Sequence, residues 1–390
     1  MACSLSSRCL QAWGAKSKAI SLLIVVDTKN LALYGGGIAH WFIPLLAAWV
    51  EHKKDERFLL LGPPFNDDFL PKSGNWEHVP LAWPLWLPRP FRHPYYDNLL
   101  FPRAVARLQP NLVMSPYHDV RMPKGLPSVI TVHDLCLDEL SGVYPQRIRS
   151  YYLALLRINL NRASHVITVS DTSKNKLAKR YGVPLNQVSV VYNTVSNYFT
   201  HSTSALEILA FKSRFSLPGR FLLYSGGSEY RKNVERLVMA FEVLVQKQTD
   251  LTLLVTGNPD PRWHTALENA SPLAQSRVKF AGKLSESDLC LAYSAADTVV
   301  YPSLCEGFGR VCLEAMEAGT PIACSDLPVM REVAGDYACW FDPFDNLSIV
   351  AAIEKALAEK RKEVVRDERF QAKAVKASFL DAMDTVASQN

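Results

Sequence analysis

The sequence lacks the features of a metal-bound, disulfide-rich or membrane-spanning protein. Its 390 residues include eight cysteines, but none forms a Cys-x-x-Cys pair and no His/Cys cluster has zinc-ligand spacing. Several cysteines stand in apolar runs, so we expect reduced thiols and a cytoplasmic protein. The apolar run 20–26 is too short to cross a membrane and ends at Asp27, and residues 1–18 contain no continuous apolar segment. We therefore expect neither a signal peptide nor a transmembrane helix.

The sequence also lacks a dominant charge. It has 43 Lys and Arg residues against 38 Asp and Glu residues, and no basic run reaches the density of a nucleic-acid-binding arm. The net charge of +5 suits a phosphorylated substrate or an anionic membrane face. With 48 % hydrophobic and 21 % charged residues the composition is that of a globular protein, and the length predicts two or three domains.

Apolar, strand-like runs alternate with helical patterns along the chain. Expected strands lie at 21–26, 58–61, 112–114, 129–132, 166–169 and 188–191, and then at 221–224, 251–255, 278–281, 298–301, 321–324 and 338–341. The clearest helical patterns lie at 147–163, 172–181, 234–245, 287–295, 310–318 and 348–358. This alternation predicts an α/β fold with two doubly wound parallel sheets, joined by a polar linker at 196–204.

The most informative stretch follows the expected strand 298–301. It reads Glu306-Gly307-Phe308-Gly309-Arg310-Val311, and Glu314 follows within the next helix. Free amides at a helix start bind phosphate, and glycines let a ligand approach the backbone. The two flanking carboxylates suit hydroxyl groups, so the pattern indicates a nucleotide-sugar. The alternative is a helix junction whose glutamates cap the helix or face solvent.

A second candidate loop follows the expected strand 221–224. It contains Gly227 and then Arg231 and Lys232 directly before a helical pattern. A lysine at the carboxyl end of a parallel strand can reach a phosphate oxygen. The alternative is that both cations are solvated surface charges.

The first half carries a glycine-rich loop after its first expected strand. Gly35, Gly36 and Gly37 resemble part of a dinucleotide fingerprint, but His40 replaces the third glycine, which makes a dehydrogenase a weak interpretation. Pro44 removes an amide from the segment that follows, so we expect its helix to start late or to kink.

Other candidates stand at strand ends or in a proline-rich loop. His133 ends the expected strand 129–132, and Tyr117 and His118 follow the strand 112–114, where they suit an acceptor side. Trp83 and Trp86 lie in the loop 83–92, whose prolines argue against regular helix or central strand. This loop suits an acceptor or membrane-surface contact, and the alternative is a packed connector.

Together these strings resemble the retaining, GT-B-fold glycosyltransferases of family 4. The resemblance implies two Rossmann-like domains facing each other across a cleft, at 1–200 on the acceptor side and 205–365 on the donor side, with a helix at 366–390 that crosses back to the first domain. It implies that Lys232 holds the donor pyrophosphate, with His133 and Glu306 acting on the donor sugar. It further implies donor contacts from the glycine loops and from a segment along the nucleobase, namely Gly36, Gly37, Gly227, Gly282, Lys283 and Leu284. Many relatives have an arginine where this chain has Gly226, so we expect Arg231 or another residue to supply the second cation.

The expected function is retaining transfer of a hexose, with mannose from GDP-mannose favoured. The expected acceptor is a glycan or lipid-linked sugar in surface polysaccharide synthesis, such as that of lipopolysaccharide, with a peripheral contact to the inner membrane face. No Asp-x-Asp stands in the donor region, so we expect neither metal nor other cofactor. The alternatives are a nucleotide-sugar epimerase of the same fold and a non-catalytic sugar-nucleotide-binding subunit. A phosphorylase would require a lysine carrying pyridoxal phosphate and a longer chain.

Overall fold

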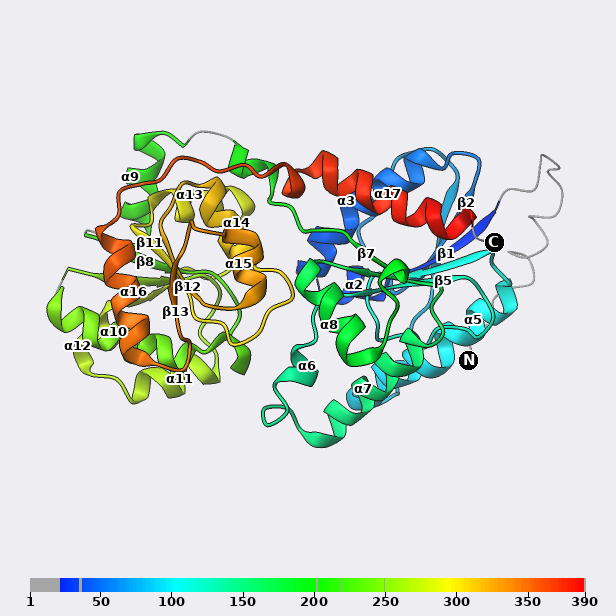
Figure 1. Ribbon diagram of the computed structural model, residues 1–390, viewed down its shortest axis with the longest axis horizontal. Coiled ribbons are helices and arrows are strands. Elements are labelled where there is room, and N and C mark those ends of the chain that lie inside the picture. Colours follow the sequence, from blue (N-terminus) through cyan, green and yellow to red (C-terminus); the bar gives the residue numbers. More distant parts are fainter. Residues whose placement is uncertain (1–21, 35–36, 201–202, 218, 249, 389–390) are drawn as a thin grey trace. The chain divides into compact units, whose positions relative to one another are not determined.

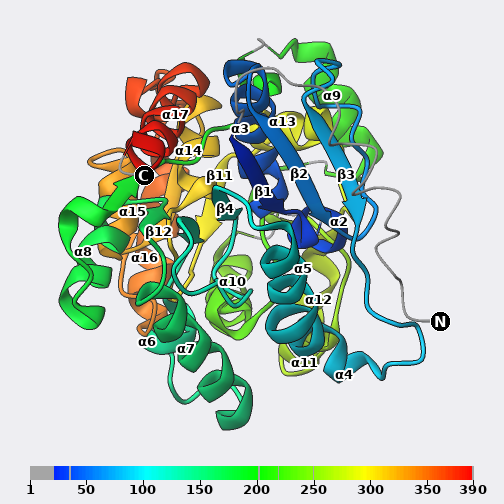
Figure 2. The ribbon, with the colours of Figure 1, turned by 90° about the vertical axis from the view of Figure 1, so that its right-hand side faces the viewer.

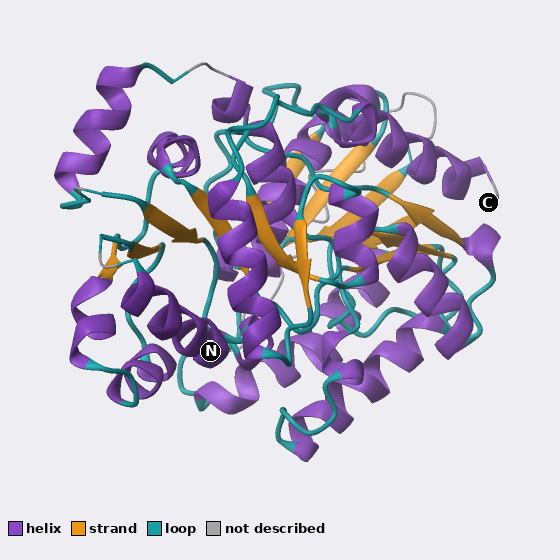
Figure 3. Cartoon of the chain, turned by 60° about the vertical axis from the view of Figure 1, so that its left-hand side comes forward, coloured by secondary structure: helices purple, strands orange, loops and turns teal. Residues whose placement is uncertain are grey.

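The computed structural model describes residues 22–34, 37–200, 203–217, 219–248 and 250–388. The chain divides into two compact units. Of the described residues, those within 1–130, 161–165 and 384–390 form the first unit, and those within 131–160 and 166–383 form the second. Strands and helices alternate along the described chain, and helices cover the strands (Figure 3).

The first sheet has seven strands in the order β3-β2-β1-β4-β5-β6-β7, and its described pairings are parallel. Strand β1 lies between β2 and β4 (Figure 2), so the strand order reverses there. In open α/β sheets this is the point where the strand ends leave room for polar groups. The strands are β1 (Leu23–Asp27), β2 (Arg57–Gly62), β3 (Trp76–Pro80), β4 (Leu112–Ser115), β5 (Ser128–Val132), β6 (His165–Thr168) and β7 (Val188–Val190).

Helices connect β1 to β2, β3 to β4, β5 to β6 and β6 to β7, whereas loops connect β2 to β3 and β4 to β5. The helices are α2 (Lys29–Tyr34), α3 (Gly37–His52), α4 (Arg89–Tyr95), the π-helix η1 (Tyr96–Leu100), α5 (Phe101–Leu108), α6 (Cys136–Glu139), α7 (Gln146–Leu160), α8 (Asp171–Tyr181) and the short 3-10 turns η2 (Leu185–Gln187) and η3 (Asn197–Thr200).

The second sheet has six strands in the order β10-β9-β8-β11-β12-β13. These are β8 (Phe221–Tyr224), β9 (Thr252–Val255), β10 (Val278–Phe280), β11 (Thr298–Tyr301), β12 (Ile322–Ser325) and β13 (Cys339–Phe341). The accompanying helices are α9 (Ala205–Arg214), η4 (Tyr230–Lys232), α10 (Val234–Lys247), α11 (Pro261–Glu268), α12 (Pro272–Arg277), α13 (Glu286–Ala295), α14 (Arg310–Glu317), α15 (Pro328–Ala334), α16 (Asn346–Ala358), η5 (Glu368–Phe370) and α17 (Ala372–Ser388).

The second sheet is buried on both faces, which explains its uninterrupted apolar strands. On one face Tyr224 belongs to a core cluster that includes Phe241 of α10 and Ile353 of α16. On the other face the sulfur of Cys324 lies 3.4 Å from that of Cys312 in α14. Figure 1 shows α10 and α16 on one side of β12 and α14 on the other. The second sheet is therefore covered by helices on both faces, and its polar groups lie mainly in the loops.

The predicted fold class is confirmed, because both halves are parallel sheets covered by helices. The domain boundaries at 1–200, 205–365 and 366–390 stay a prediction. Near the end of α17, Asp384 pairs with Lys53 at 2.8 Å and with His52 at 3.6 Å, and all three residues belong to the first unit.

One expectation about proline is wrong, and a second is wrong as to where a helix starts. The loop 83–92 does enter a regular helix, because α4 begins at Arg89 with Pro90 in its first turn, where no hydrogen bond is lost. Helix α3 does not start late either: it begins at Gly37 and contains Pro44. Strand β3, with the sequence Trp-Glu-His-Val-Pro, was not predicted, because it is partly exposed at the sheet edge and has no apolar run. Within the described residues, no helix is long and apolar enough to cross a membrane.

A buried ionic cluster lies at the carboxyl ends of β1 and β4. The ammonium group of Lys29 contacts the carboxylates of Asp97 and Asp119, the latter at 2.6 Å, and none of these side chains is more than 6 % exposed. Tyr96 donates to Asp27 at 3.1 Å. Burial raises the pKa of Asp27 to about 6, with Lys29 opposing that shift. Lys29 thus compensates several carboxylates that the sheet edge removes from water.

We expect Lys29→Met to destabilise the protein by roughly 3–5 kcal/mol, because removing one partner leaves the other charges buried and unpaired. Urea unfolding at neutral pH measures the change, with Lys247→Met as the control, since Lys247 forms an exposed pair with Glu354. A change below about 1 kcal/mol for Lys29→Met would show that the cluster is not a structural requirement.

Candidate functional site

Four polar side chains of the second unit converge on the carboxylate of Glu306. Its Oε1 atom accepts hydrogen bonds from Arg231 Nη1 at 2.6 Å, Lys232 Nζ at 2.7 Å, Ser303 Oγ at 2.7 Å and the Tyr301 hydroxyl at 2.8 Å. The Lys232 side chain is 9 % exposed and that of Glu306 is 12 % exposed. The alternative in which Arg231 and Lys232 are solvated surface charges is wrong.

Adjacent loops of the sheet bring this cluster together. Tyr301 is the last residue of β11, and Lys232 ends the short turn η4 that follows β8. Strands β8 and β11 are neighbours, so their carboxyl ends open at the same edge. The Leu304 amide donates to the Arg231 carbonyl at 2.6 Å and ties the two loops to each other. The cluster is therefore positioned by the backbone as well as by its ion pairs.

The cluster carries one carboxylate and two cations. Burial alone would raise the pKa of Glu306, but Lys232 and Arg231 outweigh burial and lower this pKa to about 2. Burial also lowers the pKa of Lys232, an effect that Glu306 opposes in part. Burial of the guanidinium would lower the pKa of Arg231, but Glu306 and further neighbouring groups together raise it. The net positive charge that remains suits an anionic ligand.

The glycine loop before α14 packs against the backbone of other segments. A Cβ atom at Gly307 would lie 1.7 Å from the carbonyl oxygen of His133, so no side chain fits there. The Gly307 carbonyl accepts from Ser170 Oγ at 2.7 Å and from Ser173 Oγ at 3.3 Å. Gly309 has a φ of 117° and is the N-cap of α14, with no side-chain cap. The first amides of this buried helix start are therefore not covered by a capping side chain, as an anion site requires.

Glu314 lies in α14 and has partners of its own. Its Oε1 atom accepts from Arg310 Nε at 2.8 Å, its Oε2 atom accepts from the Tyr293 hydroxyl at 2.5 Å, and the residue is 4 % exposed. Glu314 raises the pKa of Arg310. The alternative in which both glutamates face solvent is wrong, because each carboxylate is held by named donors.

The structure places the remaining predicted donor residues in several environments. The Gly227 carbonyl accepts from the Tyr224 hydroxyl at 2.5 Å, and Gly282, at a φ of 68°, forms an isolated bridge with Gly257. Phe308 and Val311 are buried at 5 % and 7 % exposure. His133 and Leu284 are half-buried, whereas Lys283 is exposed. Gly36 lies outside the described residues.

The predicted acceptor-side residues belong to the first unit. The rings of Tyr117 and His118 lie 4.3 Å apart, and His118 is buried. Trp83 packs edge-on against Tyr96 at 6.2 Å, whereas Trp86 is 79 % exposed. Gly37 begins α3. Their assignment to an acceptor stays a prediction.

The expectation that all cysteines are reduced is wrong at one pair. Cys136 and Cys305 form a disulfide, whereas the described cysteines Cys290, Cys312, Cys324 and Cys339 are free thiols. The bonded residues are separated by 169 positions, so no local cysteine spacing in the sequence predicts the bond.

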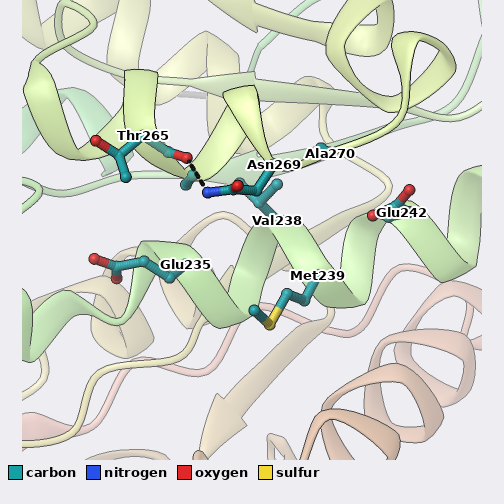
Figure 4. A pocket seen from close by; sticks show the side chains of 8 residues that line it. Glu235, Val238, Met239, Glu242, Thr265, Asn269 and Ala270 are labelled. Carbon is teal, nitrogen blue, oxygen red and sulfur yellow. Dashed lines mark hydrogen bonds between the residues drawn. The ribbon is translucent and has the colours of Figure 1, made fainter.

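Sequence reasoning also missed Tyr301, Ser303 and Tyr293. Tyr301 was visible as the last residue of a predicted strand, which is where parallel sheets place functional side chains. Tyr293 lies within α13, and its contact with Glu314 depends on the packing of two helices. A separate pocket lies between α10 and α11 (Figure 4), and its lining includes Glu235 and Glu242 but no residue of the Glu306 cluster.

Two family profiles match the chain in succession. "Glycosyltransferase Family 4" matches residues 36–197, and "Glycosyl transferases group 1" matches residues 207–375. The chain belongs to the family 4 glycosyltransferases.

Similar proteins have been named for mannose transfer. This glycosyltransferase is 28 % identical over 258 residues to the O-antigen chain mannosyltransferase B of Escherichia coli, a match that covers 65 % of this chain and 67 % of the relative. It is 29 % identical over 243 residues to the O-antigen chain mannosyltransferase RfbU of Salmonella typhimurium, covering 62 % and 64 % of the two chains.

Solved structures share the fold of this glycosyltransferase. WaaG, a glycosyltransferase involved in lipopolysaccharide biosynthesis, superimposes with a TM-score of 0.69 at 19 % identity, covering 94 % of this chain and 96 % of WaaG. HepE of Anabaena, solved in complex with UDP-glucose, gives a TM-score of 0.67 at 18 % identity, covering 94 % and 100 %. The predicted GT-B architecture is therefore confirmed as a fold class.

We expect Glu306→Gln to change the acid stability of the protein. A carboxyl whose pKa falls from 4.5 to about 2 on folding stabilises the folded state above pH 4.5 and loses this contribution as the pH falls toward 2. The pH-dependent part of the stability difference between wild type and Glu306→Gln should be about 3 kcal/mol at pH 7 and roughly half of that at pH 3. Urea unfolding at both pH values measures it, and a difference that does not change with pH would contradict the ion-pair account.

Proposed function

We propose that this glycosyltransferase moves a hexose from a nucleoside-diphosphate sugar to a glycan or lipid-linked acceptor with retention of configuration and without a metal. The observation that carries the proposal is the convergence of buried Lys232 and partly buried Arg231 on Glu306 beside the start of α14. Mannose is the favoured sugar and surface polysaccharide the favoured product, because the similar proteins are named as O-antigen mannosyltransferases.

The donor diphosphate binds Lys232, Arg231 and the first amides of α14. Arg231 takes the role of the second cation, which relatives place at the position of Gly226, because its guanidinium already lies beside Lys232 on the same carboxylate oxygen. A charge-assisted contact of this kind contributes about 1.5–3 kcal/mol. The helix start adds its dipole to the same ligand.

The two glutamates act on opposite ends of the donor. The four hydrogen bonds to Glu306 described above all go to Oε1, and we assign Oε2 to the hydroxyls of the donor sugar. Glu314 lies about a turn and a half into α14, and we assign it to the ribose. His133, whose backbone touches Gly307, faces the donor sugar.

The leaving diphosphate is neutralised by the protein. Lys232, Arg231 and the α14 amides are fixed before the reaction, so they stabilise the developing charge with little reorganisation. The acceptor hydroxyl attacks from the face that the diphosphate leaves, and a phosphate oxygen takes its proton. No group of three or more metal-ligating side chains is present among the described residues.

We expect transfer or slow hydrolysis from one member of a panel of GDP-, UDP- and ADP-sugars, and we expect it to persist in excess EDTA. Product sugars are measured by chromatography, and anomeric configuration is read by NMR. Epimerised donor without transfer would favour an epimerase, and activity that is lost on chelation and restored by Mg²⁺ would contradict the metal-independent step. Binding without turnover of any donor would favour a non-catalytic subunit.

Matched variants separate the roles within this panel. Lys232→Ala should weaken binding of the nucleoside diphosphate by roughly 10- to 150-fold, whereas Lys247→Ala, on the exposed pair with Glu354, should not. Glu306→Gln should slow transfer but spare diphosphate binding, and Glu314→Gln should weaken that binding. If Glu306→Gln weakens diphosphate binding and Glu314→Gln does not, then Glu306 contacts the ribose and Glu314 contacts the donor sugar.

We further propose that the first unit contacts an anionic membrane surface. Leu85, Trp86 and Phe91 are 87 %, 79 % and 61 % exposed, and Arg89 is exposed beside them. Residues 78–96 contain no acidic side chain. Exposed aromatic and aliphatic groups among arginines suit the boundary between lipid headgroups and acyl chains.

We expect the protein to float with vesicles that contain phosphatidylglycerol and less with pure phosphatidylcholine vesicles. Replacing Leu85, Trp86 and Phe91 by serine should abolish flotation, because the inserted apolar area is lost. The control replaces Leu206 and Leu209 of α9, which are 78 % and 63 % exposed. Equal flotation of both variants would assign membrane binding to another surface.

A further inference from the structure

The Cys136–Cys305 disulfide joins two segments that carry residues of the proposed donor site. Cys305 immediately precedes Glu306, and Cys136 follows His133 by three positions. Both cysteines belong to the second unit, and their Cα atoms lie 5.6 Å apart. The bond therefore fixes the spacing between the Glu306 loop and the segment after β5.

The same two segments already touch through their backbones. Gly307 packs against the His133 carbonyl, and Ser170 holds the Gly307 carbonyl by a hydrogen bond of 2.7 Å. Cys136 and Cys305 are 2 % and 3 % exposed. Backbone packing and hydrogen bonds can open and close rapidly, whereas a buried disulfide opens only on reduction.

The rest of the described chain does not use disulfides. Cys312 and Cys324 have sulfur atoms 3.4 Å apart and are nevertheless free thiols. Cys290 and Cys339 are also buried thiols. A single disulfide among reduced cysteines is typical of redox sensing in a reducing compartment, whereas structural frameworks use several.

We propose that Cys136 and Cys305 form a redox lock on the donor site. In the disulfide state the Glu306 loop and the segment after β5 are held together, and a nucleoside diphosphate enters and leaves slowly. In the dithiol state the two segments separate transiently, and the same ligand exchanges faster. This inference rests on the proposed function, because it assigns regulation to that site.

The oxidant is a small disulfide of the glutathione class. One cysteine thiolate attacks a sulfur of glutathione disulfide, forms a mixed disulfide and releases one glutathione thiolate. The second cysteine attacks the mixed disulfide, the Cys136–Cys305 bond forms, and a second glutathione leaves. The protein loses two electrons and two protons, which the two glutathione thiols carry away. A small dithiol reverses both steps.

The test compares oxidised protein, dithiol-treated protein and Cys136→Ser with GDP and UDP as probes. Peptide mapping without reductant should show the Cys136–Cys305 link after treatment with glutathione disulfide. Stopped-flow measurements should show nucleotide release on the order of tenfold faster from the reduced protein, a barrier change of about 1.4 kcal/mol. Cys136→Ser should release nucleotide at the fast rate in both buffers.

The control variant is Cys290→Ser, whose residue lies outside the lock. The Cys290 thiol donates to the Tyr198 carbonyl at 3.3 Å, a contact that a serine hydroxyl also makes. This variant should keep the redox dependence of wild type. Loss of the dependence in Cys290→Ser would overturn the assignment to Cys136 and Cys305.

Hydrogen exchange separates failure of the lock from failure of the proposed function. Peptides covering 133–139 and 303–309 should exchange faster in the reduced protein, whether or not a nucleotide binds. If neither GDP nor UDP binds in either state, the proposed function fails. Hydrogen exchange alone then tests whether the disulfide holds the two segments together. Absence of the link after oxidation, or equal exchange in both states, overturns the lock. Equal release rates for a probe that binds overturn it as well.

Discussion

The site depends on one constraint: a carboxylate lies between two cations at the carboxyl ends of the strands in the second sheet. An isolated carboxylate with the exposure of Glu306 would be costly to bury, and Arg231 and Lys232 remove that cost. The carboxylate in turn opposes the effect of burial on both cations. The three charges therefore stabilise one another, and a backbone hydrogen bond from Leu304 to Arg231 joins the loops after β8 and β11.

This mutual dependence means that the site is assembled before any ligand arrives. The cations are held by Glu306, Tyr301 and Ser303 do not need to move to complete the cluster, and Glu314 is held separately by Arg310 and Tyr293. Preformed donors and acceptors lower the reorganisation that binding and catalysis require. The first unit has its own buried ionic cluster around Lys29, so each sheet carries charge at its strand ends.

The sequence predicted the parts of this protein that depend on local pattern. Strands such as 298–301 and helix α14 were recognised because buried parallel strands are continuously apolar and because glycine precedes the helix. Lys232 and the two glutamates were found because they stand at strand and helix ends. The partners of Glu306 were not found, because Tyr301 looks like any strand residue until the fold places its hydroxyl beside a charge. The Cys136–Cys305 bond was missed because long-range pairing leaves no periodic signal, and strand β3 was missed because its exposed edge position leaves no apolar run.

The close approach of Gly307 to the His133 carbonyl has a consequence for how the specificity of this protein can change. The two backbones are in contact, so position 307 has no room for a side chain that could change the space around it. Under the proposed function, the space for a donor sugar beside this contact is therefore shaped by the flanking residues, above all by His133 and Glu306. A change toward another sugar would then alter those flanking residues, while position 307 remains glycine.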